Sequence, residues 1–463
     1  MPHPLQSNTQ TKPPEVDSPQ AKVTALQQAF PKQGLFSGKH WRLSPRAFPL
    51  SPKTVRQLEH IGSLLHRFQR ASDTLYRRSH NGSLPPWIHQ YLDRGKPAPL
   101  IELGIDPLIQ KQLPRVIRPD LILTEQGFAM AELDSVPGGI GLTAWLNQTY
   151  TQNLADAHIV GGADGMLKGF ASTFKNGADL VISQEACDYL PESEWLVNQL
   201  NQSSNNKTWQ VHPAEGYQND GSRDAYRFFE LFDLPNLPGI EKLAHSAAAG
   251  DLDLSAPFKA FLEEKMWLAL FWSRPLQQIW RRELREGNWK RLQQLIPRSW
   301  ILDPAPLPHH AVIPQLEINS FQELKNFSQT EREYVLKISG FSEIGWGSRS
   351  VSIGHDQSQT EWSAAIDNAL DSFDSHPYVL QEFHNGKLVQ HPYLDPESGQ
   401  IIEMEGRVRL CPYYFTPPPL SATGIGEVKL GGVLATICPA DKKILHGMSE
   451  AIMVPCTMDE DGY

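Results

Sequence analysis

The segment 118–134 constrains the fold most strongly, because it has the pattern of a hairpin that carries charge on one face. Two short apolar runs, 121–124 and 128–133, are separated by Glu125-Gln126-Gly127. A three-residue connection whose glycine can take a positive φ is typical of a hairpin. The connection sets a register in which Arg118 faces Asp134, Asp120 faces Glu132, Ile122 faces Met130, and Thr124 faces Phe128.

This register gathers the carboxylates of Asp120, Glu132 and Asp134 on one face, because side chains alternate along a strand. Like charges that oppose each other in a sheet cost roughly 0.2–1 kcal/mol. A hard divalent cation among them would remove that cost, and oxygen-only ligands favour Mg²⁺ or Mn²⁺. The alternative is a solvated hairpin face that Arg118 neutralises.

Composition limits the class of protein. The chain has 463 residues, 40% of them hydrophobic, which predicts two domains with sizeable cores plus appendages. A formal net charge of −10 argues against general nucleic-acid binding, which needs basic surface. The 4 cysteines are scattered without a CxxC pair, as expected for reduced thiols. No signal-peptide pattern and no apolar run of about 20 residues is evident, so we expect a cytoplasmic protein without a membrane partner.

Patterns along the chain predict four regions. Residues 1–35 are rich in Pro, Gln, Ser, Thr and Lys, and are expected to form a disordered tail. Residues 36–115 form a helical N-terminal segment, because apolar residues recur at helical spacing after residue 51. Residues 116–255 combine the hairpin with alternating strands and helices, typical of a Rossmann-like α/β unit. Residues 256–463 begin with helices and continue as mixed α+β. Strands are expected at 179–183, 209–212, 334–339, 378–383 and 400–411.

A second candidate site follows the strand that contains Lys337. The strand runs into a loop with Gly340, Gly345 and Gly347, and Ser348 follows the last glycine. Glycines let backbone N–H groups approach an anion closely, and a lysine beside such a loop can reach the same phosphates. The spacing is neither that of a Walker A loop nor that of a dinucleotide fingerprint. An ordinary hairpin connection and an edge-strand lysine with its stem on apolar surface are the alternatives.

Two later strands offer further polar groups. One apolar strand ends in Gln381-Glu382-Phe383. A strand edge of this kind can offer backbone N–H and C=O groups to an adenine ring, while Glu382 accepts from a ribose hydroxyl or the exocyclic amine. Arg407 and Arg409 share a face of the next strand, suited to phosphate or carboxylate oxygens. A core strand with a solvated end and a surface arginine pair are the alternatives.

In this order, the lysine strand, the glycine loop, the Gln381-Glu382-Phe383 segment and the arginine strand resemble the ATP-grasp nucleotide fold. Residues 263–270 are similar to the helix before its lysine strand, which implies that Lys265 is a second phosphate-contacting lysine. Most ATP-grasp enzymes carry the acidic metal motif after the arginine strand, whereas here it lies upstream. That circularly permuted order is similar to glutathionylspermidine synthase and its uncharacterised relatives. Residues 124–141 resemble their metal-binding stretch, and 209–240 their pre-ATP-grasp domain.

The resemblance spans about residues 115–440. It implies an α+β chain with a circularly permuted ATP-grasp fold, a Rossmann-like pre-ATP-grasp domain and a helical N-terminal segment. The implied activity is that of an ATP- and Mg²⁺-dependent ligase, which joins a small-molecule or peptide carboxylate to an amine through an acyl phosphate. An ATP-binding module without ligase activity and an ATP-grasp kinase are the alternatives.

The resemblance also implies roles for individual residues. The catalytic group would be Arg118, Lys337 and Arg409. Nucleotide binding would involve Lys265, Lys337, Gly340, Gly345, Gly347, Ser348, Gln381, Glu382 and Phe383. Asp120, Glu132 and Asp134 would hold Mg²⁺ or Mn²⁺. Asp134 replaces the usual Asn of the family's Glu-x-Asn pattern, which would change metal affinity more than it removes the site.

Overall fold

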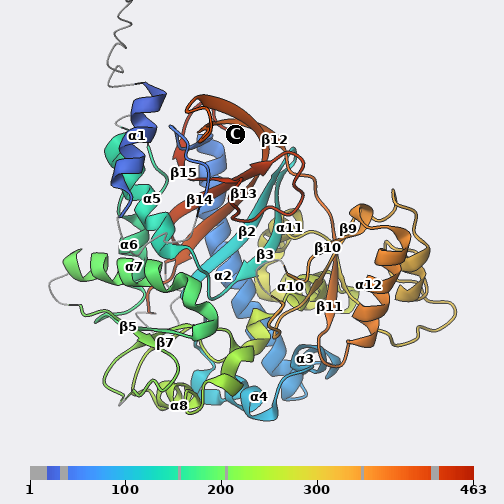
Figure 1. Cartoon of the computed structure of the whole chain (residues 1–463). Coiled ribbons are helices and arrows are strands. Elements are labelled where there is room, and N and C mark those ends of the chain that lie inside the picture. Colours follow the sequence, from blue (N-terminus) through green and yellow to red (C-terminus); the bar gives the residue numbers. More distant parts are fainter. Residues whose placement is uncertain are drawn as a thin grey trace, which may run out of the picture.

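The computed structural model describes residues 18–31, 40–154, 158–203, 207–219, 221–345, 349–418 and 427–463. These residues form a mixed α+β protein with three β-sheets, one of seven strands and two of four (Figure 1). The α+β class expected from the sequence is confirmed. Within the described ranges, no helix combines the length and the apolar character needed to span a bilayer.

The seven-stranded sheet joins segments from both halves of the chain. Its order is β1-β15-β14-β13-β2-β3, and β12 pairs with the first half of β13. The strands are β1 (Phe48–Leu50), β2 (Val116–Thr124), β3 (Gly127–Asp134), β12 (Leu388–Leu394), β13 (Ile401–Phe415), β14 (Lys429–Pro439) and β15 (Ile452–Met458). The expected hairpin is therefore β2–β3, and it lies beside the strand of Arg409 rather than in the sheet formed by residues 179–255.

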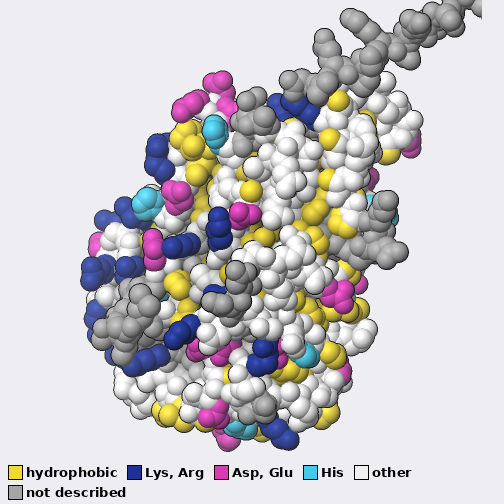
Figure 2. All heavy atoms as spheres, turned by 90° about the vertical axis from the view of Figure 1, so that its left-hand side faces the viewer, with side chains coloured by type: hydrophobic (Ala, Val, Ile, Leu, Met, Phe, Trp, Pro, Cys, Tyr) yellow, Lys and Arg dark blue, Asp and Glu magenta, His cyan; other side chains and the backbone are white. Residues whose placement is uncertain are grey.

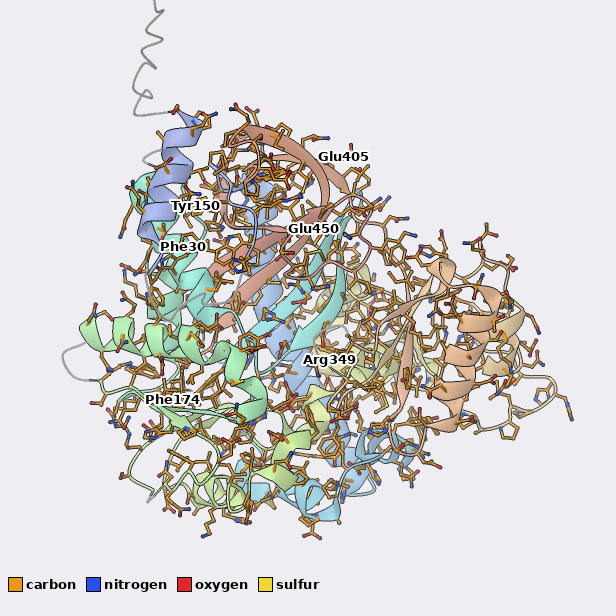
Figure 3. The ribbon with its side chains drawn as sticks, in the orientation of Figure 1. Phe30, Tyr150, Phe174, Arg349, Glu405 and Glu450 are labelled. Carbon is orange, nitrogen blue, oxygen red and sulfur yellow. The ribbon has the colours of Figure 1, made fainter. Side chains whose placement is uncertain are left out.

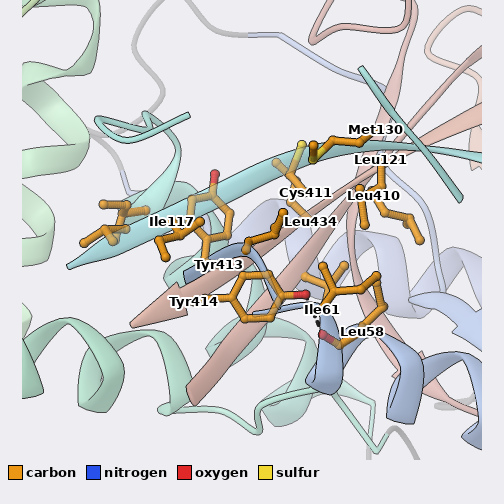
Figure 4. Packing of buried hydrophobic residues seen from close by; sticks show 14 of the residues in the cluster. Leu58, Ile61, Ile117, Leu121, Met130, Leu410, Cys411, Tyr413, Tyr414 and Leu434 are labelled. Carbon is orange, nitrogen blue, oxygen red and sulfur yellow. Dashed lines mark hydrogen bonds between the residues drawn. The ribbon is translucent and has the colours of Figure 1, made fainter. Parts of the chain in front are cut away.

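Helix α2 (Pro52–His80) packs on this sheet, as the apolar spacing after residue 51 predicts. Ser51 caps the helix by accepting from the Thr54 N–H at 3.2 Å. Tyr414 of β13 crosses the interface, and its hydroxyl donates to the Leu58 carbonyl at 2.5 Å (Figure 4). Gly62 makes this close approach possible, because a Cβ there would lie 2.4 Å from the Tyr414 ring.

Helices α5 (Ile140–Asn153) and α6 (Gly165–Ser172) also pack on this sheet, and α1 (Pro19–Ala29) packs on α5. Helix α1 lies in the segment that we expected to be a tail, and it buries Val23 and Leu26. That expectation is wrong for this helix, while residues 1–17 and 32–39 lie outside the described residues. On this side of the molecule, acidic and basic side chains lie among one another (Figure 2).

A four-stranded parallel sheet forms the Rossmann-like unit. Its order is β5-β4-β6-β7, with α7 packed on β5 and α8 on β7. The elements are β4 (Asp179–Ile182), α7 (Leu190–Ser203), β5 (Gln210–Pro213), β6 (Ala225–Phe228), α8 (Glu241–Ala249) and β7 (Leu254–Ser255). The alternation of strands and helices that the sequence predicts here is present in the structure.

The third sheet is antiparallel, in the order β10-β9-β11-β8. Its strands are β8 (Ser299–Ile301), β9 (Tyr334–Ile338), β10 (Ser352–Ile353) and β11 (Tyr378–Glu382). Helix α12 (Gln359–Asp371) begins in a capping box and packs Trp362 and Ile366 against Leu336 and Leu380. Alternate residues of β9 and β11, including Lys337, therefore face away from α12.

The remaining helices connect these layers. They are α3 (Trp87–Asp93), α4 (Ala98–Ile105), α9 (Met266–Trp272), α10 (Gln277–Leu284) and α11 (Glu286–Leu295). The helices expected at the start of residues 256–463 are α9, α10 and α11. Helix α9 contacts β8 and α11 contacts β3, so this group links the third sheet to the seven-stranded sheet.

Candidate functional site

The β2–β3 hairpin has the expected register at its base and a different one near its turn. Arg118 pairs with Asp134 and Asp120 with Glu132, as predicted, but Thr124 pairs with Gly127 rather than Phe128. The turn is therefore one residue shorter than expected, and a bulge beside Asp120 restores the register. Ala131 is the extra residue, so Ala131 and Glu132 both line the same cavity as Asp120.

Two arginines hold the carboxylates of the hairpin. Arg118 Nε donates to Asp120 Oδ1 at 3.1 Å, and Arg118 Nη2 donates to Asp134 Oδ2 at 3.1 Å. Arg409 of β13 donates through Nη1 to Asp120 Oδ2 at 2.9 Å. The Cys411 thiol donates to Asp120 Oδ1 at 3.4 Å. Asp120 is thus the buried centre of this group.

Two lysines complete the charged group from the other side. Lys265 Nζ lies 2.7 Å from Glu132 Oε1 and donates to the Gly345 carbonyl at 3.0 Å. Lys337 Nζ donates to the Ala131 carbonyl at 2.6 Å and to Gln381 Oε1 at 2.9 Å. The lysines therefore bridge the hairpin to the glycine loop and to the third sheet.

Burial and neighbouring charges shift the pKa values of these groups. Burial would raise the pKa of Asp120, but Arg118 and Arg409 hold it below its ordinary value. Burial raises the pKa of Asp134 above its ordinary value although Arg118 opposes the shift. Burial lowers the pKa of Lys337 to about 8, and Lys265 adds to this effect. Lys337 thus gives up its proton more readily than an exposed lysine.

A cavity of about 130 Å³ lies between the seven-stranded sheet and the third sheet. Its charged end has Lys265, Lys337 and Arg409 together with Asp120 and Glu132. The apolar residues that line it come from both sheets, from positions next to β8, β10 and β11, and from the loop after β14: Ile122, Ala129, Ala131, Pro297, Val335, Val351, Ile353, Phe383, Ile444 and Leu445. Arg118 and Asp134 do not line the cavity. Arg118 donates to Asp120, which does line it, and also to Asp134.

The glycine loop lies against the segment that carries Lys265. The Lys265 N–H donates to the Ser339 carbonyl at 2.9 Å, and a Cβ on Gly340 would lie 2.9 Å from the Glu263 carbonyl oxygen. Gly345 lines the cavity, whereas Gly340 does not, and Gly347 and Ser348 lie outside the described residues. Just after them, Arg349 reaches the segment between β4 and α7, with Nη1 4.0 Å from Glu185 Oε1 (Arg349 is labelled in Figure 3).

The Gln381-Glu382-Phe383 segment lines the cavity, but its backbone differs from our expectation. We expected a strand edge with free N–H groups, whereas β11 lies between β9 and β8. The Glu382 N–H donates to the Arg298 carbonyl at 2.9 Å and the Phe383 N–H to the Glu333 carbonyl at 3.0 Å. These two N–H groups are used within the protein, so they are not free to donate to an adenine ring.

Several lining residues carry no signal in the sequence. His384 and Gly386 follow β11, and Lys443, Ile444 and Leu445 come from the loop after β14. Lys443 also forms an ion pair with Asp356. Arg407 lines the cavity next to Arg409. The sequence does predict this arrangement, because it places both arginines on one face of a strand. No motif marks the loop after β14, so only the three-dimensional structure brings it to the cavity.

The chemistry of the donor set suits a hard cation. Asp120 and Glu132 oppose each other on neighbouring strands, and both face the cavity. Carboxylate oxygens are the ligands that Mg²⁺ takes in phosphate sites. In the described residues, however, no group of three His, Cys, Asp or Glu side chains is placed to hold a metal ion. Each hairpin carboxylate is instead paired with a basic side chain, so a metal would have to replace some of these pairs.

Comparisons with known proteins bear on the fold. No family model and no curated protein matches this chain. It is similar to a solved glutathione synthetase-like effector from Globodera pallida, in apo form, with a TM-score of 0.53 and 10% sequence identity. A Methylobacillus flagellatus structure, provisionally assigned as a gamma-glutamylcysteine synthetase, has a TM-score of 0.38, 12% identity and coverage of 84% of this chain and 87% of its own, too weak to carry an argument. The first alignment covers 96% of this chain and 98% of the effector, so this chain has the fold of a glutathione synthetase-like protein.

Proposed function

We propose that this protein is an ATP- and Mg²⁺-dependent carboxylate–amine ligase with a circularly permuted ATP-grasp fold, similar to glutathionylspermidine synthase. The cavity between the two sheets carries this proposal, because it joins an apolar slot to an end with three cations and two carboxylates. A nucleoside triphosphate matches both parts of this lining. Its planar base suits the apolar side chains, and its phosphate chain, which binds a divalent cation, suits the charged groups. The likeness of fold to a glutathione synthetase-like effector supports the same class of reaction.

In this proposal, the base lies in the apolar slot and the phosphates at the charged end. Ile122 and Ala129 would contact one side of the nucleotide, and Val335 and Ile353 the other. The Glu382 carboxylate would accept from the ribose or the exocyclic amine. Lys265, Lys337 and Arg409 would hold the phosphate oxygens, and their fixed charges stabilise a transferring phosphoryl group.

Asp120 and Glu132 would hold the metal, with Asp134 as a further carboxylate beside Arg118. Bound Mg²⁺ would neutralise charge that develops on the phosphate oxygens. The ion pairs Lys265–Glu132 and Arg409–Asp120 hold these carboxylates in place before a ligand enters. Lys265 and Arg409 would donate to the phosphates in place of their present carboxylate partners, Glu132 and Asp120.

The chemistry has two steps. A substrate carboxylate attacks the γ-phosphorus, ADP leaves, and an acyl phosphate forms. An amine then attacks the acyl carbon, phosphate leaves, and the amine loses a proton as the amide forms. The glycine loop, anchored to the Lys265 segment, would cover the acyl phosphate and exclude water.

Nucleotide binding is tested first, by thermal unfolding with Mg·ATP or a non-hydrolysable analogue. At about 100 times its dissociation constant, a ligand of the folded state alone stabilises it by about 2.7 kcal/mol. The shift should shrink in EDTA and in Lys337→Ala. It should persist in Lys290→Ala, because Lys290 is exposed on α11 and outside the cavity. An absent shift at millimolar Mg·ATP would contradict the proposal.

The reaction is tested next, by screening amino acids, short peptides and polyamines for ADP release that needs both an acid and an amine. With a productive acid and no amine, hydroxylamine should trap the acyl phosphate as a hydroxamate. A stable phosphorylated product without hydroxamate would identify a kinase instead. Binding of Mg·ATP without ADP release in any combination would favour a module that binds ATP only.

A further inference from the structure

A second hollow, of about 540 Å³, lies along the outer edge of β8. Helices α3 and α9 form one side, and residues 312–315 with Phe321 form the other. This volume is in the range of small-molecule pockets, about 300–1,000 Å³. The hollow, called here the β8 groove, takes no part in the proposed ligase reaction.

The walls of the β8 groove are aromatic and held in place. The Trp272 indole N–H donates to two backbone carbonyls at 3.2 and 3.0 Å, and the Trp300 indole N–H donates to the Pro314 carbonyl at 3.1 Å. The Tyr91 hydroxyl donates to Asp303 Oδ2 at 2.5 Å, and its ring packs edge-on against Trp87 with centroids 5.9 Å apart. Because their polar ends are bound by the protein, these rings need no rearrangement to receive a ligand.

The charged residues of the groove are both arginines. Arg274 and Arg298 line it, and none of the residues that line it is acidic. The Arg298 guanidinium lies over the Trp272 ring, with Cζ 4.7 Å from the ring centroid. Neither guanidinium donates to an acceptor in the part of the chain that the structure describes. A guanidinium on an aromatic face keeps its N–H donors in its own plane, where a carboxylate or phosphate can accept from them.

We propose that the β8 groove is a binding site for a small organic anion that carries an aromatic ring. The ring would stack among Trp87, Trp272 and Trp300, and the carboxylate or phosphate would accept from Arg274 and Arg298. This site is distinct from the cavity between the sheets, although Ser299 of the groove accepts from Gln381 Nε2 at 3.3 Å. Its occupancy can be measured without nucleotide, so the test is independent of the proposed ligase activity.

The probe is 2-naphthoate, titrated into the full chain by calorimetry and by quenching of tryptophan fluorescence. We expect saturable one-to-one binding, at least tenfold tighter than that of 2-naphthylmethylamine, which has the same ring with a positive charge. Hexanoate, an anion without a ring, should also bind at least tenfold more weakly. Equal affinity for the naphthyl anion and cation, or no saturation at millimolar 2-naphthoate, would overturn the proposal.

Two variants locate the site. Arg274→Gln and Arg298→Gln should each weaken 2-naphthoate binding by about tenfold or more, as expected for loss of a hydrogen bond to a charged group. Arg291→Gln, a change of an exposed arginine on α11 outside the groove, should leave the affinity unchanged. Arg274 is exposed, so its variant tests the proposal even if Arg298→Gln fails to fold. An unchanged affinity for 2-naphthoate in Arg274→Gln would overturn the proposal. A stable dimer that Arg274→Gln dissociates would also overturn it, because the groove would then be an interface between two copies of the chain.

Discussion

Lys337 shows how one residue links burial to ligand binding. It is 5% exposed, and its amine contacts only a carbonyl and an amide oxygen among the described residues. Burial lowers its pKa to about 8, with a further contribution from Lys265. Bound triphosphate would favour the cation and raise this pKa again, because an opposite charge stabilises the charged form.

Nucleotide binding should therefore take up protons near pH 8.5, where the amine of the free protein is largely neutral. At pH 6.5 the amine is already charged, so the uptake should disappear. Calorimetry in buffers of different ionisation enthalpy measures this uptake. The slope of the observed binding enthalpy against the ionisation enthalpy of the buffer gives the number of protons taken up. Lys337→Met should remove the slope at pH 8.5, whereas Lys290→Met should keep it. A slope that Lys337→Met leaves intact would show that another group takes up the proton.

At the scale of elements, the hairpin shows what the sequence could and could not predict. The sequence correctly predicted that Asp120 pairs with Glu132 across the two strands. It did so, however, from a turn that is one residue longer than the turn in the structure. The bulge at Ala131 compensates for the shorter turn. An alanine in a strand gives no sign of a bulge, so periodicity alone could not place it. Similarly, the sequence predicted the strand 378–383. It did not predict that β8 pairs with the edge of this strand that β9 leaves open.

Glu132→Gln should therefore affect the site more than the sheet. The amide keeps the side chain opposite Asp120 but removes the charge of a proposed metal ligand. We expect loss of the Mg·ATP-induced thermal shift, with the far-UV circular dichroism of the parent protein. Glu125→Gln removes a carboxylate from the turn of the same hairpin, outside the cavity, so its thermal shift should equal that of the parent. A Glu132→Gln variant that still binds Mg·ATP in a metal-dependent way would show that Glu132 is not a metal ligand.

At the scale of the whole molecule, the site depends on contacts between distant parts of the chain. The carboxylates come from residues 120–134, and Arg409, which pairs with Asp120, lies 289 positions further along. Local patterns identified the hairpin and the lysine strand separately, and the family resemblance placed them in one site. The loop with Lys443 carries no pattern, so neither approach found it.

His391 also joins distant parts, and its titration should be visible in the stability of the whole protein. Its Nε2 lies 3.0 Å from the hydroxyl of Ser44, whose carbonyl accepts from Tyr150. Burial lowers the pKa of His391 to about 3, and Arg46 adds to this shift. Below pH 6.5 the unfolded chain binds a proton that the folded protein does not, so the folded state loses about 1.4 kcal/mol per pH unit from this histidine.

The measurement is the free energy of unfolding by denaturant at pH 6.5, 6.0, 5.5 and 5.0. Other groups contribute in this window: burial raises the pKa of Glu230 to about 8, which favours the folded protein as the pH falls. The pH dependence of the parent protein alone therefore does not test this prediction. The test is the difference in unfolding free energy between the parent and His391→Asn at each pH. The variant should lose less stability than the parent, with the gap growing by about 1.4 kcal/mol for each pH unit. A gap that stays constant from pH 6.5 to 5.0 would mean that His391 is protonated in the folded protein or reaches solvent there.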